Sequence, residues 1–256
     1  MSLVLATDAP GGEPGSEARA EPEIFASLQG EGPSLGRPSI FVRLSRCNLA
    51  CVWCDTAYTW HFAGDNRPHR SGMTFERKAN QVTLDENDVA DRILALDGDR
   101  LVVTGGEPLL QATALDCVIE RLKASRDFHV EIETNGTVAV PPSLDTRIDQ
   151  YNVSPKLAHS GNPADLALIP ERLREWAANP RAFFKFVVAD EADARAALAL
   201  ARQYEVPPDR LFLMPEGTDS ETLHARARWL VPLCQDAGVR YTDRLHIHAF
   251  GDTRGT

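Results

Sequence analysis

Apolar positions along the chain follow two periodicities that alternate. Short apolar runs are typical of buried strands, and segments with apolar residues every three to four positions are typical of amphipathic helices. We expect strands at 24–28, 40–44, 101–104, 130–133, 148–153, 183–188, 211–214 and 245–249, and helices at 85–96, 109–123, 163–178, 191–204 and 220–237. Because strand and helix take turns, the pattern predicts an α/β fold with a mainly parallel sheet and crossover helices.

Two segments of the sequence lack a clear periodicity. Residues 1–20 are rich in Gly, Pro, Glu and Ala, which predicts a flexible N-terminal tail. Residues 61–82 are polar and contain Gly, Pro and Asn, so we interpret them as an insertion. We find no linker or internal repeat in the remainder, and we therefore expect residues 21–256 to form a single domain.

The composition restricts the classes of function. A formal net charge of −10 and a pI near 5.2 disfavour a surface for nucleic acid and favour small-molecule chemistry. Five cysteines, an odd number, do not indicate the disulfide framework of a secreted protein. The sequence shows no secretory signal and no apolar stretch of membrane-spanning length. We therefore expect a cytoplasmic protein that is not bound to a membrane.

Three cysteines, Cys47, Cys51 and Cys54, follow the strand expected at 40–44. Thiolates suit zinc or iron–sulfur clusters. A structural zinc site normally takes four protein ligands, and no second Cys pair or His motif stands nearby. Three ligands on a four-iron cluster would leave one iron open for a small molecule. A degenerate zinc site in a noncatalytic interaction protein, or three reduced thiols, are the alternatives.

Residues that break the apolar pattern follow successive expected strands. They are Cys47, Thr104-Gly105-Gly106-Glu107-Pro108, Glu133-Thr134-Asn135-Gly136, Ser154-Pro155-Lys156 and Met214-Pro215-Glu216-Gly217. The carboxyl ends of parallel strands form the ligand-binding edge of α/β folds. We therefore expect these segments to meet at a single active site.

The cysteine motif, with Trp53 before its last member, and the Gly105-Gly106-Glu107-Pro108 segment resemble the radical S-adenosylmethionine (SAM) superfamily. The resemblance implies a modified partial (β/α)6 barrel, a 4Fe-4S cluster on the three cysteines, and SAM bound to its open iron. The SAM-binding residues that it implies are Trp53, Cys54, Asp55, Gly105, Gly106, Glu107, Thr134, Asn135, Ser154, Pro155 and Lys156.

Within that superfamily, the motifs together with Ser27-Leu28-Gln29-Gly30-Glu31-Gly32 and Phe41-Val42-Arg43-Leu44 resemble the 7-carboxy-7-deazaguanine synthases of queuosine and deazapurine biosynthesis. The resemblance implies a carbon–nitrogen lyase. Its 5′-deoxyadenosyl radical would abstract hydrogen from 6-carboxy-5,6,7,8-tetrahydropterin, followed by ring contraction and loss of ammonia. The substrate-binding residues that it implies are Leu28, Gln29, Gly30, Arg43, Thr104 and Thr256, and Thr56 would bind Mg²⁺.

The same resemblance implies a flavodoxin or ferredoxin as electron donor, and a homodimer. It implies no catalytic residue beyond the cluster and SAM. Another small radical SAM enzyme, such as a glycyl-radical activase, is the alternative within the superfamily. From the sequence, His246 and His248 share one face of the strand expected at 245–249.

Overall fold

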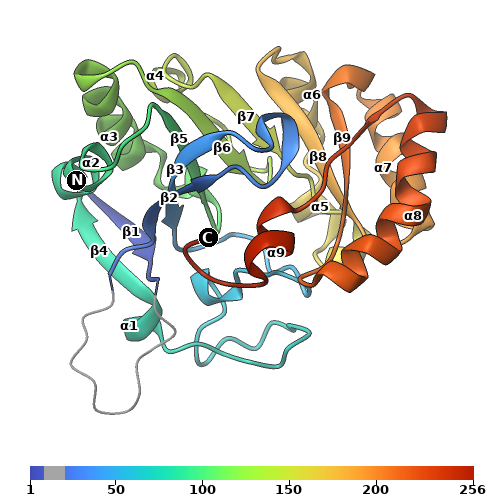
Figure 1. Cartoon of the computed structure of the whole chain (residues 1–256), viewed down its shortest axis with the longest axis horizontal. Helices are drawn as coiled ribbons and strands as arrows, with labels where there is room; N and C mark the ends of the chain where they lie inside the picture. Colours follow the sequence, from blue (N-terminus) through green and yellow to red (C-terminus); the bar gives the residue numbers. More distant parts are fainter. Residues whose placement is uncertain (9–20) are drawn as a thin grey trace.

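The computed structural model describes residues 1–8 and 21–256. Its centre is a curved sheet in which six strands run parallel in chain order (Figure 1). These strands are β3 (Pro38–Leu44), β5 (Arg100–Gly105), β6 (His129–Thr134), β7 (Gln150–Val153), β8 (Ala182–Val188) and β9 (Leu211–Pro215). A short seventh strand, β10 (Arg240–Tyr241), pairs in parallel with β9. The expected parallel α/β architecture is therefore present.

Three antiparallel strands extend the sheet beyond β3. Strand β2 (Ile24–Leu28) pairs with β3 along its first residues, and β1 (Ser2–Ala6) pairs with β3 at its end, where Leu5 lies opposite Leu44. Strand β4 (Gln81–Asp85) pairs with the outer edge of β1. The expected flexible tail is wrong for residues 2–6, because Leu3 and Leu5 are fully buried in the core and tie this segment into the sheet. Residues 9–20 of that predicted tail lie outside the described residues.

The segment expected as an insertion at 61–82 ends in regular structure. A short helix, α1 (Arg77–Asn80), leads directly into β4, so the last two residues of the expected insertion belong to the sheet. The preceding stretch lies against the cysteine loop, where Arg70 N donates to Val52 O at 2.8 Å. The single-domain boundaries remain a prediction.

Helices cover the outer face of the sheet on both sides of the molecule (Figure 1). They are α2 (Glu86–Leu94), α3 (Ala112–Ser125), α4 (Pro142–Asp145), α5 (Ala164–Ala167), α6 (Pro170–Ala178), α7 (Glu191–Gln203) and α8 (Ser220–Ala237). Aspartates at the first residue before α2, α7 and α8 accept hydrogen bonds from first-turn amides and so fix where these helices begin. Helix α4 is only four residues long, so the crossover between β6 and β7 is short.

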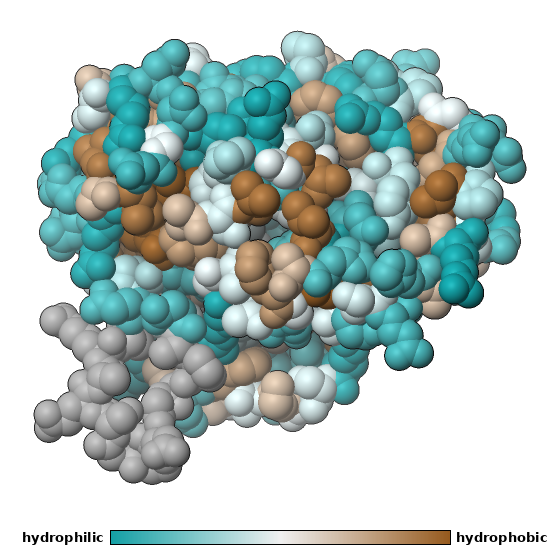
Figure 2. All heavy atoms as spheres, viewed as in Figure 1, coloured by the Kyte–Doolittle hydropathy of each residue, from teal (hydrophilic) through white to brown (hydrophobic). Residues whose placement is uncertain are grey.

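In the described part of the chain, five 3₁₀ turns lie between these elements: η1 (Gly32–Ser34), η2 (Ala57–Thr59), η3 (Pro108–Gln111), η4 (Ala158–Ser160) and η5 (Pro208–Arg210). The core is formed by the outward sides of the strands and the inward sides of the helices, with Val103, Ile132 and Phe184 packed in one cluster with Leu115 and Ile119. On the face shown in Figure 2, hydrophilic residues predominate and apolar residues form small groups. Among the described residues, no helix combines the length and apolarity needed to cross a membrane.

The strand expected at 245–249 is wrong, because these residues form helix α9 (Leu245–Phe250). The alternation of His246, Ile247 and His248 suits a strand as well as one helical turn with Ile247 buried. The helix begins where Leu245 N donates to Gly30 O at 2.9 Å, in the loop after β2. Helix α9 and the C-terminus therefore lie near the centre of the molecule (Figure 1).

Candidate active site

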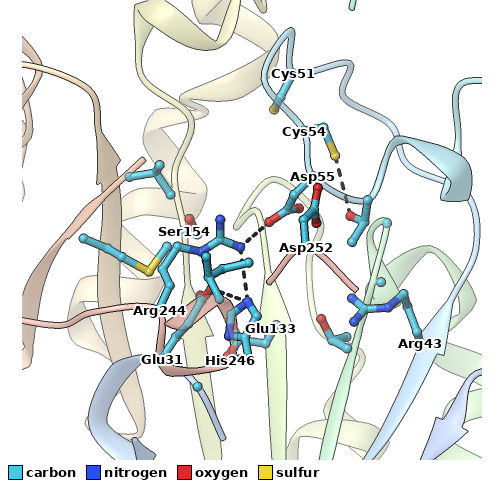
Figure 3. A pocket seen from close by; sticks show the side chains of 18 of the residues that line it. Glu31, Arg43, Cys51, Cys54, Asp55, Glu133, Ser154, Arg244, His246 and Asp252 are labelled. Carbon is cyan, nitrogen blue, oxygen red and sulfur yellow. Dashed lines mark hydrogen bonds and ion pairs between the residues drawn. The ribbon is translucent and has the colours of Figure 1, made fainter. Parts of the chain in front are cut away.

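A cavity of about 250 Å³ lies at the carboxyl ends of the parallel strands, partly covered by α9 and the C-terminal residues. All five of the segments expected at a common edge contribute residues to its lining. Figure 3 shows the three parts that meet there: thiols of the cysteine loop, an arginine from β3, and a group of charged side chains. The expected convergence of loops is thus present in the fold.

The cysteine loop is fixed by the segment that follows β7. Val52 N donates to Ser160 O at 2.9 Å, and Ala50 N donates to Asn162 Oδ1 at 2.8 Å. Gly161 lies between these contacts at φ +77°, and a Cβ atom there would come within 2.7 Å of Val52 Cγ1. A glycine is therefore required for this close approach.

All three thiols, those of Cys47, Cys51 and Cys54, line the cavity. Burial raises their pKa values, to about 12 for Cys47 and about 11 for Cys54. Each sulfur faces a side-chain N–H group: Asn135 Nδ2 at 4.0 Å from Cys47, Asn162 Nδ2 at 3.3 Å from Cys51, and Trp60 Nε1 at 3.4 Å from Cys54. Three sulfur donors with N–H neighbours fit an iron–sulfur cluster, whose positive iron ions compensate for burial of thiolate charge.

The zinc alternative requires several ligands gathered around a single ion. Among residues 1–8 and 21–256, no group of three or more His, Cys, Asp or Glu side chains is arranged to hold a single metal ion. The three sulfurs are therefore not gathered around one ion, as a structural zinc site requires.

Gly105 and Gly106 allow β5 to end against the start of the cysteine loop. A Cβ atom on Gly105 would lie 1.9 Å from Leu44 O, and one on Gly106 would lie 2.0 Å from Arg46 O. Gly106 N donates to Leu44 O at 3.0 Å in the same contact. Both glycines line the cavity, but the packing of these two backbones already requires them.

Glu107, expected among the SAM-binding residues, does not line the cavity. Its side chain is fully buried, and burial raises the pKa of the carboxyl group. It accepts hydrogen bonds from Thr134 Oγ1 at 2.9 Å and from Asn135 N at 2.7 Å. Glu107 therefore positions two residues that do line the cavity. Pro155 is also buried outside the lining.

Three of the other expected SAM-binding residues, Trp53, Ser154 and Lys156, lie close together in the cavity lining. Lys156 Nζ donates to Ser154 Oγ at 2.8 Å and lies 5.7 Å from the centre of the Trp53 ring. His159 stacks on the same ring, at 5.3 Å between ring centres. The arrangement offers an aromatic face, a hydroxyl and a cation to one ligand.

Arg43, expected to bind substrate, points from β3 into the cavity and also forms an ion pair. Its Nε donates to Glu23 Oε1 at 2.8 Å, and the hydroxyl of Tyr58 donates to Glu23 Oε2 at 2.9 Å. Glu23 is buried, whereas Arg43 is partly exposed. Since the ion pair uses Nε, it fixes the guanidinium plane without using the two Nη groups.

Sequence reasoning missed most of a charge cluster at the cavity, which consists of Glu31, Asp55, Glu133, Lys185 and Arg244; the two cations are buried. Lys185 Nζ lies 2.5 Å from Glu31 Oε2 and 2.9 Å from Glu133 Oε2. Arg244 pairs with Glu31 at 3.0 Å and with Asp55. Figure 3 labels Glu31, Asp55, Glu133 and Arg244 of this cluster, beside the cysteine loop.

Opposite charges act against burial in this cluster, although burial still raises the pKa of the Glu133 carboxyl group. Burial opposes the charge on Glu31, but Lys185 and Arg244 outweigh it and hold the pKa of Glu31 well below its ordinary value. Burial likewise opposes the charge on Lys185, but Glu133 and Glu31 raise its pKa. A lysine inside the apolar strand 182–188 is the sequence signal that could have revealed the cluster, because a buried lysine needs carboxylate partners.

Helix α9 and the residues after it complete the cavity. His246 packs on Gly30 so closely that a Cβ atom there would lie 2.2 Å from its Nδ1. Thr256 also lines the cavity, and Gly255 N donates to Glu23 Oε1 at 3.3 Å. His248 instead lies 3.1 Å from both Ser220 Oγ and Asp243 Oδ1, outside the lining.

Of the expected site residues, all except Glu107 and Pro155 line this cavity. They are Leu28, Gln29, Gly30, Arg43, Cys47, Cys51, Trp53, Cys54, Asp55, Thr56, Thr104, Gly105, Gly106, Thr134, Asn135, Ser154, Lys156 and Thr256. Their roles toward ligands remain predictions. A small cavity with both polar and apolar lining, flanked by three thiols, favours redox chemistry on a small molecule.

Comparisons with known proteins agree with this geometry. The sequence model of the "Radical SAM superfamily" matches residues 42–228, which is more than half of the chain. In fold, the chain is similar to the crystal structure of QueE from Escherichia coli, with a TM-score of 0.62, 24% identity and 95% of each chain covered. It is also similar to Streptococcus suis SuiB, with a TM-score of 0.52 and 14% identity over 79% of this chain and 47% of that one. The chain belongs to the radical SAM superfamily and has its partial-barrel fold, which confirms the expected fold class.

Curated relatives identify the family within the superfamily. The 7-carboxy-7-deazaguanine synthase of Pyrobaculum aerophilum is 37% identical over 91% of this chain and 95% of its own length. That of Halobacterium salinarum is 34% identical over 91% of both chains. The chain is a member of the 7-carboxy-7-deazaguanine synthase family, as the motifs predicted. Membership of the superfamily implies a 4Fe-4S cluster and SAM.

Proposed function

We propose that this enzyme converts 6-carboxy-5,6,7,8-tetrahydropterin to 7-carboxy-7-deazaguanine with loss of ammonia. The observation that carries the proposal is the meeting, in one cavity, of the three thiols, the Trp53 and Lys156 side and the arginine of β3. The three thiols suit a cluster, Trp53 and Lys156 suit SAM, and Arg43 suits a carboxylate. The order of these groups around the cavity would place the pterin next to SAM.

When bound, the cluster and SAM supply the one-electron reductive cleavage and the hydrogen abstraction that start the ring contraction. Cys47, Cys51 and Cys54 would hold the cluster. Trp53 would cover the adenine, while Ser154 and Lys156 would bind the ribose and carboxylate of SAM. Asp55, Gly105, Gly106, Thr134 and Asn135 would complete this side, with Glu107 fixing the last two.

Arg43 and the charge cluster would orient the pterin. A guanidinium forms two parallel hydrogen bonds with a carboxylate, so the Nη groups of Arg43 would bind the substrate carboxylate. The carboxyl oxygens of Glu31 and Glu133 would accept hydrogen bonds from the N–H groups at the opposite edge of the pterin. Leu28, Gln29, Gly30, Thr104 and Thr256 would form the remaining contacts, and cover by α9 would exclude water from the reacting atoms.

Replacing Arg43 by lysine tests its assignment, because lysine retains the charge facing Glu23 and loses the two-point contact. We expect kcat/KM for the pterin to fall at least about tenfold, since a charged hydrogen bond contributes about 1.5–3 kcal/mol. SAM cleavage without pterin should continue at the wild-type rate. An unchanged kcat/KM would remove Arg43 from the substrate site.

Thr56 is the proposed protein ligand of Mg²⁺, together with the substrate carboxylate and water. Its Oγ1 lies 3.6 Å from Cys54 Sγ, and Thr56 lines the same cavity as Arg43. We expect turnover to fall after removal of Mg²⁺ and to return when it is added. In Thr56→Val, the Mg²⁺ concentration for half-maximal turnover should rise several-fold, and an identical Mg²⁺ titration would exclude this ligand.

The proposal includes a flavodoxin or ferredoxin as the electron donor, a homodimer and a cytoplasmic location. Turnover with such a donor in place of dithionite tests the first, and sedimentation velocity tests the second. A glycyl-radical activase, the alternative within the superfamily, must admit a protein backbone. Cover of the cavity by α9 and the charge cluster favours a small polar substrate instead.

A further inference from the structure

Two residues outside every motif direct N–H groups at sulfurs of the cysteine loop. Trp60 Nε1 lies 3.4 Å from Cys54 Sγ, and Asn162 Nδ2 lies 3.3 Å from Cys51 Sγ. Trp60 follows η2, whereas Asn162 comes from the segment after η4, more than a hundred residues further along the chain. Two independent parts of the fold therefore place donors on two of the three thiols. The third donor, from Asn135, is at 4.0 Å and is the weakest.

The orientation of the Asn162 amide is fixed by its other contacts. Its Oδ1 accepts from Ala50 N at 2.8 Å, so the amide nitrogen must face the sulfur side. Nδ2 carries two hydrogens, and its second contact is Ser160 Oγ at 3.1 Å. All the hydrogen-bonding atoms of this side chain thus have partners, and one of them is Cys51 Sγ.

The indole of Trp60 is held in place with similar firmness. The residue is 5% exposed, and its backbone N donates to Ala57 O at 3.1 Å. The Arg67 guanidinium lies 4.8 Å from the ring centre, on the ring face, and His61 contacts the ring at 5.0 Å between centres. These contacts leave the ring edge, with Nε1, directed at Cys54.

N–H groups that donate to the ligating sulfurs change the electron affinity of the cluster. Uptake of one electron adds negative charge to the cluster and its thiolates, and an N–H dipole aimed at a ligating sulfur stabilises that added charge. We propose that Trp60 and Asn162 are positioning residues that raise the reduction potential of the cluster through N–H···S hydrogen bonds. This inference rests on the proposed cluster ligands, and it adds two residues that control how readily a low-potential donor delivers the electron.

The experiment is a redox titration of the reconstituted full-length enzyme with dithionite, monitored by electron paramagnetic resonance. Trp60→Phe removes one N–H and keeps an aromatic ring, and Asn162→Leu removes the amide at similar size. We expect each variant to lower the ratio of reduced to oxidised cluster about tenfold at a fixed solution potential, which equals a shift of about 59 mV. Trp229→Phe, on α8, is the matched control and should titrate like the wild type.

Iron and sulfide content and thermal unfolding are measured on the same samples. If the two side chains have a purely structural role, the variants will change cluster content or thermal unfolding, and the reduction potential of the clusters that do load will equal that of the wild type. That result would overturn the inference. If the Asn162→Leu variant takes up no cluster, the reduction potential of Trp60→Phe tests the inference alone, because this smaller change keeps the ring contacts. A wild-type enzyme that takes up no four-iron cluster would instead overturn the proposed ligands themselves.

Discussion

Replacing Cys51 by alanine is expected to abolish SAM cleavage while the chain stays folded. Two thiols cannot hold the four-iron cluster at the cavity, and without it no electron reaches SAM. We expect deoxyadenosine formation under dithionite to fall by at least about a thousandfold, since the uncatalysed reaction is negligible. Liquid chromatography of the reaction mixture measures this loss, and circular dichroism measures the fold.

Cys117 provides the matched control, because it is a partly buried cysteine on α3 and does not line the cavity. Cys117→Ala should retain wild-type iron content and SAM cleavage. Persistent deoxyadenosine formation by Cys51→Ala after reconstitution would contradict the cluster assignment. Loss in both variants would point to a general effect of thiol removal.

Replacing Lys185 by methionine is expected to reduce the free energy of unfolding by about 3–5 kcal/mol, because it leaves two carboxylates facing each other without their shared cation. Lys185 is 5% exposed at its side chain and contacts both Glu31 and Glu133. Methionine matches the length of the lysine stem, so lost packing contributes little. Urea unfolding followed by circular dichroism measures the change.

Lys123 is the control for this substitution. It pairs with Asp149 on the surface at 2.8 Å, where both side chains are about a third exposed. We expect Lys123→Met to change the free energy of unfolding by less than about 1 kcal/mol, as for other exposed ion pairs. If Lys185→Met has an equally small effect, the charge cluster is not needed for the stability of the fold.

The parallel strands and main helices could be predicted because each has a periodic apolar face. The structure of residues 245–249 could not be predicted in this way, and the strand expected there is a helix. Helix α9 is only six residues long, and an apolar pattern of that length does not distinguish a short helix from a strand. Strand β1 was missed for a different reason. Its apolar run precedes a Gly- and Pro-rich stretch, and only pairing with β3 and β4, distant in sequence, makes it part of the core.

For the site too, features carried by a local motif could be predicted, and features that arise from contacts between distant residues could not. Residues within motifs, such as Cys54 and Ser154, could be placed at the cavity because the topology brings the motifs together, while their roles stay predictions. Arg244 and Trp60 could not, since their roles arise from contacts with Asp55 and Cys54 that are visible only after folding. Glu107 was assigned to the ligand by its motif, but its carboxylate is used to fix the next loop.

The most direct test of the central claim is anaerobic turnover by the reconstituted wild-type enzyme. The reaction contains SAM, dithionite, Mg²⁺ and 6-carboxy-5,6,7,8-tetrahydropterin, and mass spectrometry identifies the product. We expect 7-carboxy-7-deazaguanine to form only when the cluster and SAM are both present. Unchanged pterin in a reaction where the same enzyme cleaves SAM would contradict the proposed substrate.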